Sequence, residues 1–317
     1  METVKAIQAQ ETVKPSVVSK TVIQSFVGFL DVSPLTVKTY KAGIARLMVY
    51  LQERGITKPE REDIVEFKKE LIASGRKPAT VGAYLSAIRR FFDWTESKGL
   101  YPNITKGIKA PKIDKGHKRD FLNASQIQGM MKGIDRSTVE GKRNFALLAL
   151  MATGGLRTVE VVRANVEDLS TIGGVPVLYV QGKGRTDKKD FIKLTPEVLQ
   201  AIREYLDARG EVSTLSPLFA SLSHRNCGSR LTTRTISNVA KHSMIAAGFN
   251  SHRLTAHSLR HSAVTLALMN GATLQEVSHF ARHSSISTTM IYSHDVDRLR
   301  SCCEASISTA IFSGLRL

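Results

Sequence analysis

The apolar residues of the first hundred positions recur with the period of an α-helix. Within Thr36–Arg54 they stand three and four residues apart, which places them on one helical face, and Gly55 follows as a stop signal. The same spacing predicts a second helix over Arg61–Ser74 and a third from Pro78 to near Gly99. The first twenty residues are polar and lack a clear period, so we expect a loosely attached lead-in. This part of the chain is predicted to be a small all-helical bundle.

From Phe121 onward the pattern is mixed. Pro176–Gln181 and Phe191–Leu194 are rich in strand formers and flank the basic sequence GKGRTDKKD, which predicts a β-hairpin with a long basic tip. Further helices are expected over Asn144–Ala152, Thr158–Ala164, Pro196–Arg209, Arg234–Ala247, His257–Asn270 and Thr273–Arg282, with a short one near Ser287–Ser293. The predicted fold class is therefore mainly α, with a small β-sheet or hairpin.

The two patterns are joined by a segment with almost no periodicity. Between Lys98 and Arg119 the chain carries seven basic residues and one acidic residue, with two prolines and three glycines. Such a segment is either a solvated tether or a linker that runs along a phosphate backbone, and the charge of the chain favours the second. We expect a lead-in over 1–20, a helical domain over 21–105, a basic linker over 106–120, a second domain over 121–295 and a tail over 296–317.

Composition points to a polyanionic partner. Lys and Arg number 45 against 28 Asp and Glu, which gives the 317-residue chain a formal net charge of +17. This imbalance destabilises a compact fold by self-repulsion unless a polyanion neutralises it. Nucleic acid is therefore the first partner to expect.

Several other classes of protein are excluded. No apolar run approaches the ~18–20 consecutive residues of a membrane span, and the N-terminus lacks the basic start and apolar stretch of a signal peptide. The three cysteines are odd in number, and Cys302 and Cys303 are adjacent, which fits neither a disulfide framework nor a zinc site. We expect a soluble, cytoplasmic protein that contacts no membrane.

Polar residues at helix starts and turns are the first candidates for chemistry. Arg157 follows a Gly-Gly turn, where the backbone permits close approach to a ligand, and Glu160 lies one helical turn later and could orient it. His257 and Arg260 are also one turn apart, so an imidazole and a guanidinium could meet the same anion.

Two familiar motifs are excluded. His257 and His261 have the spacing of a zinc protease, but Ser258 stands where that motif has its glutamate. Lys183 lies between two glycines, as in part of a phosphate-binding loop, but the full motif is missing and a hairpin follows instead of a helix. Nucleotide hydrolysis has no support.

The candidate residues occur together and in order along one domain. The series comprises Arg157 in TGGLR with Glu160, Lys183 on the hairpin, His257 and Arg260 in HxxR, His283 and Tyr292. It closely resembles the tyrosine recombinase (phage integrase) family, and HxxR followed by HSSISTTxIYxH is its most specific part. The resemblance covers the whole chain and implies a two-domain DNA clamp, an N-terminal core-binding helical bundle plus a tyrosine-recombinase catalytic domain.

Two positions depart from the family pattern. Gly155 stands as if inserted before Leu156, and Arg282 precedes His283 where a glycine is common. Both departures concern local backbone geometry.

The resemblance also implies a mechanism. A phosphodiester is a poor electrophile, so an enzyme that cuts and rejoins DNA without a high-energy cofactor should store the bond energy in a covalent intermediate. Tyr292 is the implied nucleophile and forms a 3′-phosphotyrosyl bond. Arg157 and Arg260 are planar forks that can hold the non-bridging oxygens of the scissile phosphate.

The remaining site residues handle protons and orientation. His257 and His283 add hydrogen bonds to the phosphate, and His257 could take the tyrosyl proton. Lys183 is the implied general acid for the leaving 5′-oxygen, and Glu160 supports Arg157. The expected reaction needs no metal and no cofactor.

The resemblance further implies that strand exchange proceeds through a Holliday junction, in a tetramer bound to two specific sites of double-stranded DNA. The tail over 296–317 is expected to dock on a neighbouring subunit, the alternative being that it packs on its own domain. DNA contacts outside the active site are expected from Lys38, Lys41, Arg89, Lys109, Lys112 and Lys115.

Two other functions stay open. A type IB topoisomerase would share the residue types but relax supercoils as a monomer, and a catalytically silent protein would only bind a specific DNA site. Among recombinases, the sequence leaves dimer resolution and integration or excision of a mobile element both possible, and the two-domain organisation favours an Xer-like protein.

Overall fold

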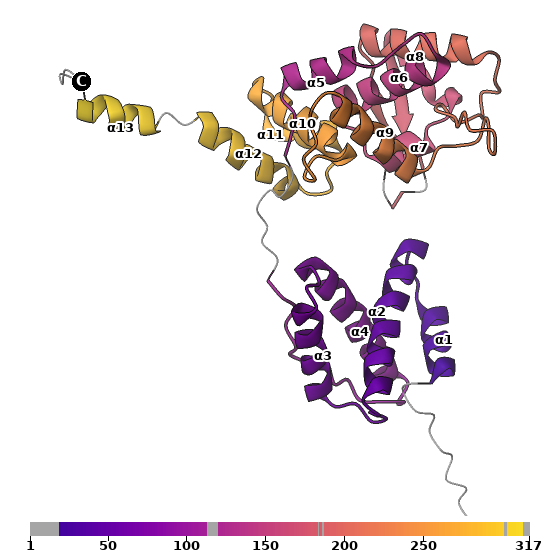
Figure 1. The fold of residues 1–317 in the computed structure, drawn as a ribbon, viewed down its shortest axis with the longest axis vertical. Helices are drawn as coiled ribbons and strands as arrows, with labels where there is room; N and C mark the ends of the chain where they lie inside the picture. The colour runs from indigo at the N-terminus through magenta and orange to yellow at the C-terminus, as the bar shows by residue number, and fades with distance from the viewer. Residues whose placement is uncertain (1–18, 113–119, 183, 186, 301–302, 313–317) are drawn as a thin grey trace, which may run out of the picture. The chain divides into compact units, whose positions relative to one another are not determined.

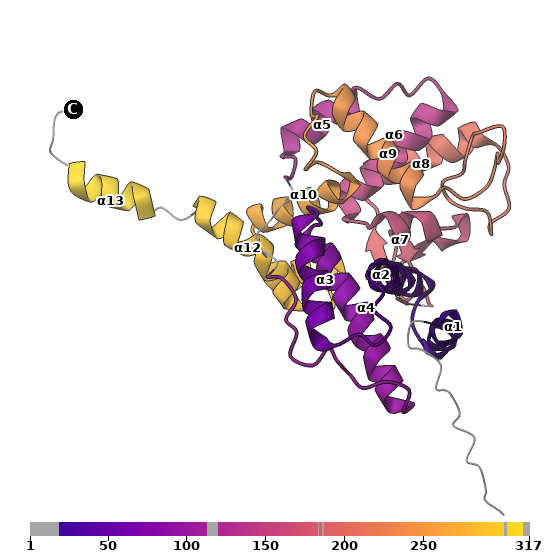
Figure 2. The same cartoon turned by 60° about the horizontal axis from the view of Figure 1, so that its bottom comes forward.

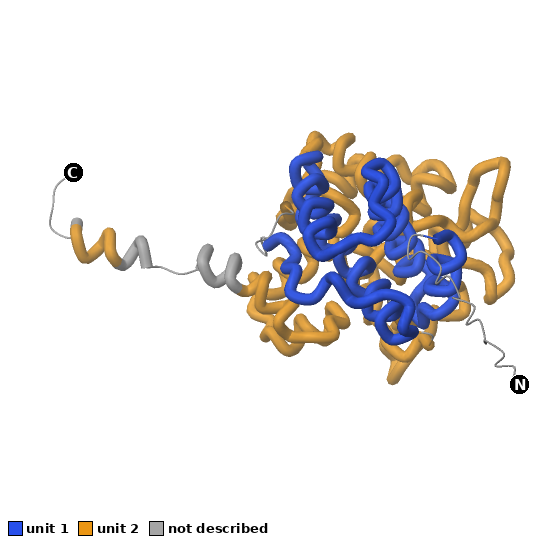
Figure 3. Tube along the Cα trace, turned by 90° about the horizontal axis from the view of Figure 1, so that it is seen from below, with its two compact units in different colours: residues 1–115 blue, residues 116–317 orange. Residues whose placement is uncertain are grey.

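A computed structural model of the protein describes residues 19–112, 120–182, 184–185, 187–300 and 303–312. The chain divides into two compact units, residues 1–115 and 116–317 (Figure 3). Each has its own hydrophobic core, and each is described here by itself. Within the described residues, no helix is both long enough and apolar enough to cross a membrane.

The first unit consists of helices packed around one aromatic-rich core (Figure 1). They are α1 (Lys20–Phe29), α2 (Pro34–Glu53), α3 (Arg61–Ala73) and α4 (Pro78–Ser97). The helix α2 begins where Ser33 accepts a hydrogen bond from the backbone N–H of Thr36, with proline at the first helical position. The backbones of α2 and α4 approach closely, since a Cβ at Gly43 would lie 3.1 Å from the Cα of Tyr84.

The core of this unit extends past α4 into the basic segment. Ile108 is 5% exposed and packs with the helices, and its carbonyl oxygen accepts a hydrogen bond from Arg89. The polypeptide therefore still belongs to the first unit two residues beyond the expected start of the linker at Lys106.

The second unit combines helices with one small sheet (Figure 2). Its helices are α5 (Ala124–Lys132), α6 (Val139–Gly154), α7 (Thr158–Arg163), α8 (Pro196–Arg209), α9 (Thr233–Ala246), α10 (Ala256–Met269), α11 (Leu274–Ala281), α12 (Ile286–Arg300) and α13 (Cys303–Phe312), with a short 3-10 turn, η1, at Val166–Asp168. The strands β1 (Leu169–Ile172), β2 (Val175–Val180) and β3 (Asp190–Lys193) form an antiparallel sheet in the order β1-β2-β3. Leu169 pairs with Leu178, and Leu178 pairs with Ile192.

The apolar helix α6 lies in the centre of the second core and packs against α8 and α10. Leu147, Leu148 and Leu150 are fully buried. A smaller cluster, which includes Val264, Val277 and Tyr292, joins α10, α11 and α12. This cluster brings the last part of the predicted motif next to α10.

The predicted fold class is confirmed, and several elements differ from the sequence-based expectations. The helix α1 (Lys20–Phe29) precedes the first predicted helix, which was expected to begin at Thr36. The strand β1 was not expected, because only Leu169 of its four residues is half-buried and no alternation marks it. The helix α5 was also missed, although Asn123 caps it by accepting a hydrogen bond from the N–H of Gln126 at 2.9 Å. The short helix near Ser287–Ser293 is instead α12, which continues to Arg300 through the expected start of the tail at Val296.

Candidate active site

The turn between α6 and α7 positions the first pair of candidate residues. The helix α6 ends at Gly154, and Gly155 adopts φ 58°, a left-handed conformation that favours glycine. A Cβ on Gly155 would lie 3.0 Å from Cε1 of Phe280, so a side chain there would crowd the phenylalanine ring. The turn places Arg157 immediately before α7.

Glu160 holds Arg157 by two contacts. Oε2 of Glu160 accepts the backbone N–H of Arg157 at 2.9 Å, and Oε1 accepts Nη1 of Arg157 at 2.9 Å. The Glu160 side chain is fully buried, whereas that of Arg157 is 27% exposed. The guanidinium of Arg157 is therefore both oriented and accessible.

Arg260 on α10 is the second guanidinium. It is 1% exposed, its Nη1 donates to the carbonyl oxygen of Gly155 at 2.6 Å, and its Nη2 donates to the carbonyl oxygen of Ala281. These two bonds use two of its five N–H hydrogens and leave the others for another acceptor. Burial and the neighbouring Arg157 lower the pKa of Arg260 to about 10, so the group remains charged at neutral pH.

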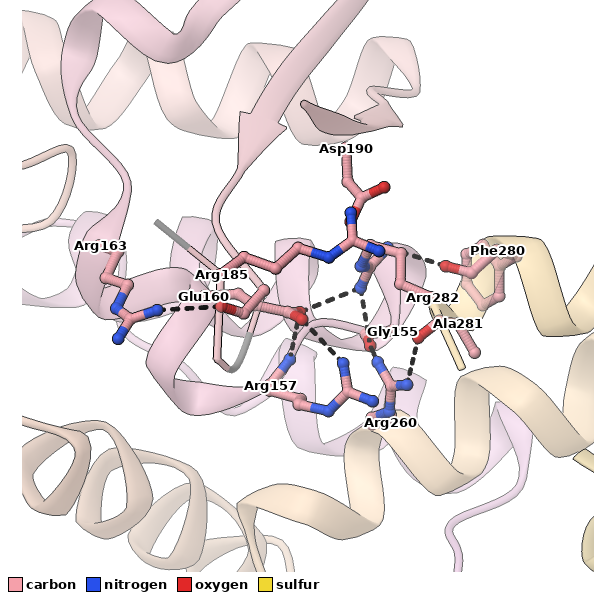
Figure 4. A network of polar contacts seen from close by, with 11 residues as sticks. Gly155, Arg157, Glu160, Arg163, Arg185, Asp190, Arg260, Phe280, Ala281 and Arg282 are labelled. Atoms are coloured by element: carbon pink, nitrogen blue, oxygen red, sulfur yellow. Dashed lines mark hydrogen bonds and ion pairs between the residues drawn. The ribbon is translucent and has the colours of Figure 1, made fainter. Parts of the chain in front are cut away.

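Arg282, at the end of α11, brings a third guanidinium to the same place (Figure 4). Its Nη2 lies 3.0 Å from Oε2 of Glu160, and its Nη1 donates to the carbonyl oxygen of Phe280 at 2.8 Å. Its side chain is 6% exposed. Burial opposes ionisation of Glu160, but Arg282 and Arg157 outweigh burial and hold the pKa of that carboxyl below its usual value.

His283 and Tyr292 lie beside this cluster. Nδ1 of His283 is 2.8 Å from Oγ1 of the buried Thr289, and its ring stacks on that of Tyr292 with centroids 6.2 Å apart and an interplanar angle of 18°. Burial, followed by Arg260 and Arg157, lowers the pKa of His283 to about 4. His283 is therefore neutral at neutral pH.

Tyr292 is 6% exposed and lies between two histidine rings. The ring of His261 meets it edge-on, with centroids 4.7 Å apart and an interplanar angle of 68°. Tyr292 is also close enough to Arg260 for a phenolate at this position to raise the pKa of Arg260. The phenol thus lies within electrostatic reach of the most buried guanidinium of the cluster.

His257 lies on α10, one turn before Arg260, and is exposed. A positive charge on it would lower the pKa of His283, which indicates that the two imidazoles face the same region. The structure thus brings together Arg157, Glu160, His257, Arg260, His283 and Tyr292.

Lys183 lies outside the described residues, but its neighbours Gly182 and Arg185 are described and border a cavity. Gly182 and Arg185 line a cavity of about 590 Å³ together with Arg157, Arg282 and His283. Nη1 of Arg163 donates to the carbonyl oxygen of Gly182 at 3.0 Å, and Arg185 pairs with Asp190 at 2.9 Å (Figure 4). The base of the hairpin and the arginine cluster therefore border one cavity.

The expected DNA contacts of the first unit and the linker have different surroundings. Lys38, Lys41, Lys109 and Lys112 are exposed, and Arg89 is half-buried with its guanidinium bound to the carbonyl of Ile108. Lys115 lies outside the described residues. In the described part of the chain, no group of three or more His, Cys, Asp and Glu side chains is arranged to hold a metal ion.

Sequence reasoning missed the roles of two residues. Arg282 was noted only as a departure from a glycine, and that departure was itself the available signal, because a position where glycine is common often has a positive φ, as Arg282 does. His261 was considered only as a metal ligand, although its position next to Arg260 already placed it on the same helix as that candidate phosphate-binding arginine.

Comparisons with known proteins cover both units. The model of the phage integrase family matches residues 120–298, and that of the phage integrase N-terminal SAM-like domain matches residues 23–99. Tyrosine recombinase XerC of Salmonella typhi is 30% identical over 294 residues, which are 90% of this chain and 94% of that protein. Tyrosine recombinase XerD of Listeria innocua is 31% identical over 292 residues, 88% of this chain and 95% of that protein.

A solved structure shares the fold. The XerH site-specific recombinase bound to palindromic difH substrate, in a post-cleavage complex, superposes with a TM-score of 0.71 at 21% identity, over 86% of this chain and 79% of that chain. The chain belongs to the phage integrase family and is a tyrosine site-specific recombinase. The resemblance seen in the sequence is thereby confirmed.

Proposed function

We propose that this tyrosine recombinase cuts and rejoins double-stranded DNA at specific sites through a 3′-phosphotyrosyl intermediate on Tyr292. One observation carries the proposal: the Tyr292 phenol is buried against the His283 ring and lies within electrostatic reach of Arg260. A phenol has an ordinary pKa near ~10, so nearby cations are needed to stabilise the phenolate during attack.

The first step exchanges one phosphodiester for another. Oη of Tyr292 attacks the scissile phosphorus, the new O–P bond forms, and the bond from phosphorus to the 5′-oxygen breaks. The tyrosyl proton passes to a base, for which His257 is our candidate, and the leaving oxygen takes a proton from Lys183. No bond energy is lost, so the reverse attack by a 5′-hydroxyl of the partner strand rejoins the DNA.

The arginine cluster would stabilise the transition state. Arg157 is exposed on one side and held by Glu160 on the other, so it can bind a phosphate oxygen without reorientation. Arg260 is fixed by two carbonyl oxygens and retains N–H hydrogens for the phosphate. His283, with a pKa of about 4, takes part as a neutral hydrogen-bonding group rather than as a cation.

The position of Lys183 as general acid is supported by its neighbours. Gly182 and Arg185 border the same cavity as Arg157 and His283. We therefore assign to Lys183, which follows Gly182 in the sequence, the proton that the leaving oxygen takes.

Trapping of covalent complexes tests this function. The protein is incubated with fragmented genomic DNA and denatured, and the DNA attached to it is sequenced. We expect a recurrent sequence at the attached ends and a 3′-phosphotyrosyl linkage, both absent for Tyr292→Phe. Tyr179→Phe, a half-buried tyrosine on β2, is the matched control and should keep the adduct. An adduct that persists in Tyr292→Phe would remove Tyr292 from its role.

We further propose a tetramer on two sites, with the chain end docking on a neighbouring subunit. Ile307 and Ile311 on α13 are 57% and 58% exposed, which suits a segment that another surface covers. Because α12 continues to Arg300, the informative truncation ends there and leaves Tyr292 on an intact helix. The truncated chain should bind one site but fail to join two sites in a gel shift. Normal pairing and recombination by the truncated chain would show that the chain end packs on its own domain.

The biological role proposed is Xer-like recombination. The XerC and XerD relatives align with this chain over 94% and 95% of their own length, so the two-domain organisation is common to them. Sequenced adducts at one chromosomal locus would support dimer resolution, whereas adducts at the ends of a mobile element would support integration and excision. Adducts without a shared sequence would indicate a topoisomerase.

A further inference from the structure

Arg282 occupies a backbone conformation that L-residues rarely adopt. Among the residues that the structure describes, it alone has a positive φ without being a glycine, with φ 53° and ψ 46°. Glycine takes this conformation without the steric penalty that a Cβ brings. An arginine held there is therefore maintained by what its side chain does.

The Arg282 side chain completes the surroundings of Glu160. Oε1 of that carboxylate accepts a hydrogen bond from Nη1 of Arg157. Oε2 accepts two hydrogen bonds, one from the backbone N–H of Arg157 and one from Nη2 of Arg282. The carboxylate is fully buried, so it cannot turn toward solvent. The charge of Arg282 is the largest single influence that lowers the pKa of Glu160, followed by the hydrogen bonds and the charge of Arg157.

We propose that Arg282 is a positioning residue for DNA cleavage, which locks Glu160 against Arg157 and offsets the carboxylate charge at the phosphate-binding site. This inference rests on the proposed function. With Arg282, three guanidinium groups face one carboxylate, and two positive charges remain uncompensated. Attack by a phenolate on a phosphodiester builds a transition state with two negative charges, so the remaining charge of the site matches it.

Without Arg282, the buried Glu160 would cancel one of the two remaining guanidinium charges. The site would then still match the singly charged phosphodiester but not the doubly charged transition state. Loss of Arg282 should therefore slow cleavage more than it weakens DNA binding.

The protonation of His283 gives an independent readout. It is faced by Arg260 and His257 from α10, by Arg157 from the start of α7, by Arg282 from the end of α11, and by Tyr292 and Thr289 from α12. Arg282 is one of the cations that keep the pKa of His283 low, after burial, Arg260 and Arg157. Neutralising Arg282 should raise that pKa and move the acid limb of the cleavage rate to higher pH.

The test compares Arg282→Gly, Arg282→Gln and Arg282→Lys on the DNA site recovered from the covalent adducts. Two versions of this site are used, one with the natural scissile phosphate and one with a methylphosphonate, which lacks one negative charge. We expect Gly and Gln to slow adduct formation roughly tenfold or more on the phosphate and much less on the methylphosphonate. Lysine keeps the charge and should rescue part of the rate.

Two controls separate positioning from folding. Arg136→Gln removes an arginine that pairs with Glu204 on α8, and it should leave both rates unchanged. In a Glu160→Gln background, the charge that Arg282 offsets is gone, so Arg282→Gly should cost much less than it does alone. Glycine fits the left-handed position, and circular dichroism should show that this variant is folded.

The outcomes are distinct. Suppose that the wild type forms adducts and the Arg282 variants form them at the same rate. Arg282 then has no positioning role, and the same conclusion holds if the variants slow adduct formation equally on both substrates and in both backgrounds. If the wild type forms no adduct with any DNA, the proposed function fails and this inference fails with it.

Discussion

The guanidinium of Arg260 donates a hydrogen bond to the carbonyl oxygen of Gly155 at 2.6 Å, across 105 positions of the chain. The bond connects α10 to the turn that carries Arg157, and the same carbonyl lies 3.3 Å from Nη2 of Arg282. One backbone oxygen thus ties Arg260 and Arg282 to the turn that carries Arg157. The turn at Gly155 should therefore affect both stability and catalysis.

Gly155→Ala should destabilise the second unit by about 2 kcal/mol or more, because it combines a positive φ with crowding against Phe280. Gly173→Ala is the matched control, since Gly173 has φ 55° and open space around its Cα, and should cost only about 1 kcal/mol. Calorimetry of both variants measures the difference. Equal losses would mean that Phe280 moves aside without cost.

Lys183→Ala should slow cleavage far more on ordinary DNA than on a site whose 5′ leaving oxygen is replaced by sulfur, because a thiolate leaves without a proton. Arg260→Ala should be deficient on both substrates, since it acts on oxygens that the sulfur does not replace. Single-turnover rates on nicked, labelled site DNA measure both effects. An equal loss on the two substrates would reduce Lys183 to a phosphate contact.

His283 should make the stability of the protein depend on pH. Burial and the surrounding arginines lower its pKa from 6.5 to about 4, so the unfolded chain binds a proton that the folded chain excludes. The free energy of unfolding therefore falls as the pH drops from 6.5 toward 4, and it is insensitive to His283 at higher pH.

His283→Gln should flatten this part of the profile, as measured by urea unfolding at several pH values. Glu160 contributes its own dependence at lower pH, because its pKa is held below the usual carboxyl value and its stabilisation is lost as the pH falls. An unchanged slope between pH 4 and 6.5 in His283→Gln would show that other groups exclude the proton.

Neutralising Lys109, Lys112 and Lys115 together should lower the magnitude of the slope of log affinity against log salt by about 2 to 3 units. A protein with fewer phosphate contacts releases fewer counterions when it binds DNA. The effect should be similar on unrelated DNA sequences, since phosphate contacts carry no base information. Gel shifts over a salt series measure the slope. A triple variant with the wild-type slope would identify the basic segment as a solvated tether.

Local sequence patterns were enough to predict several helices and the family of this protein. Helical spacing predicted α2, α3 and α4 to within a few residues, because an amphipathic helix needs only its own apolar face to be recognised. The order of Arg157, HxxR and the His283–Tyr292 segment indicated the family without any coordinates. These signals are local, or depend only on the order of residues.

Tertiary structure alone decided which charged side chains pair with which partners. Nothing near Arg282 in the sequence indicates Glu160, which lies 122 positions away, and nothing near Arg260 indicates the carbonyl of Gly155. The strand β1 also escaped detection, because pairing with β2 rather than an alternating pattern holds it. Buried ion pairs and backbone contacts of this kind depend on the packing of α6, α7, α10 and α11, and packing brings together residues whose spacing in the chain carries no period.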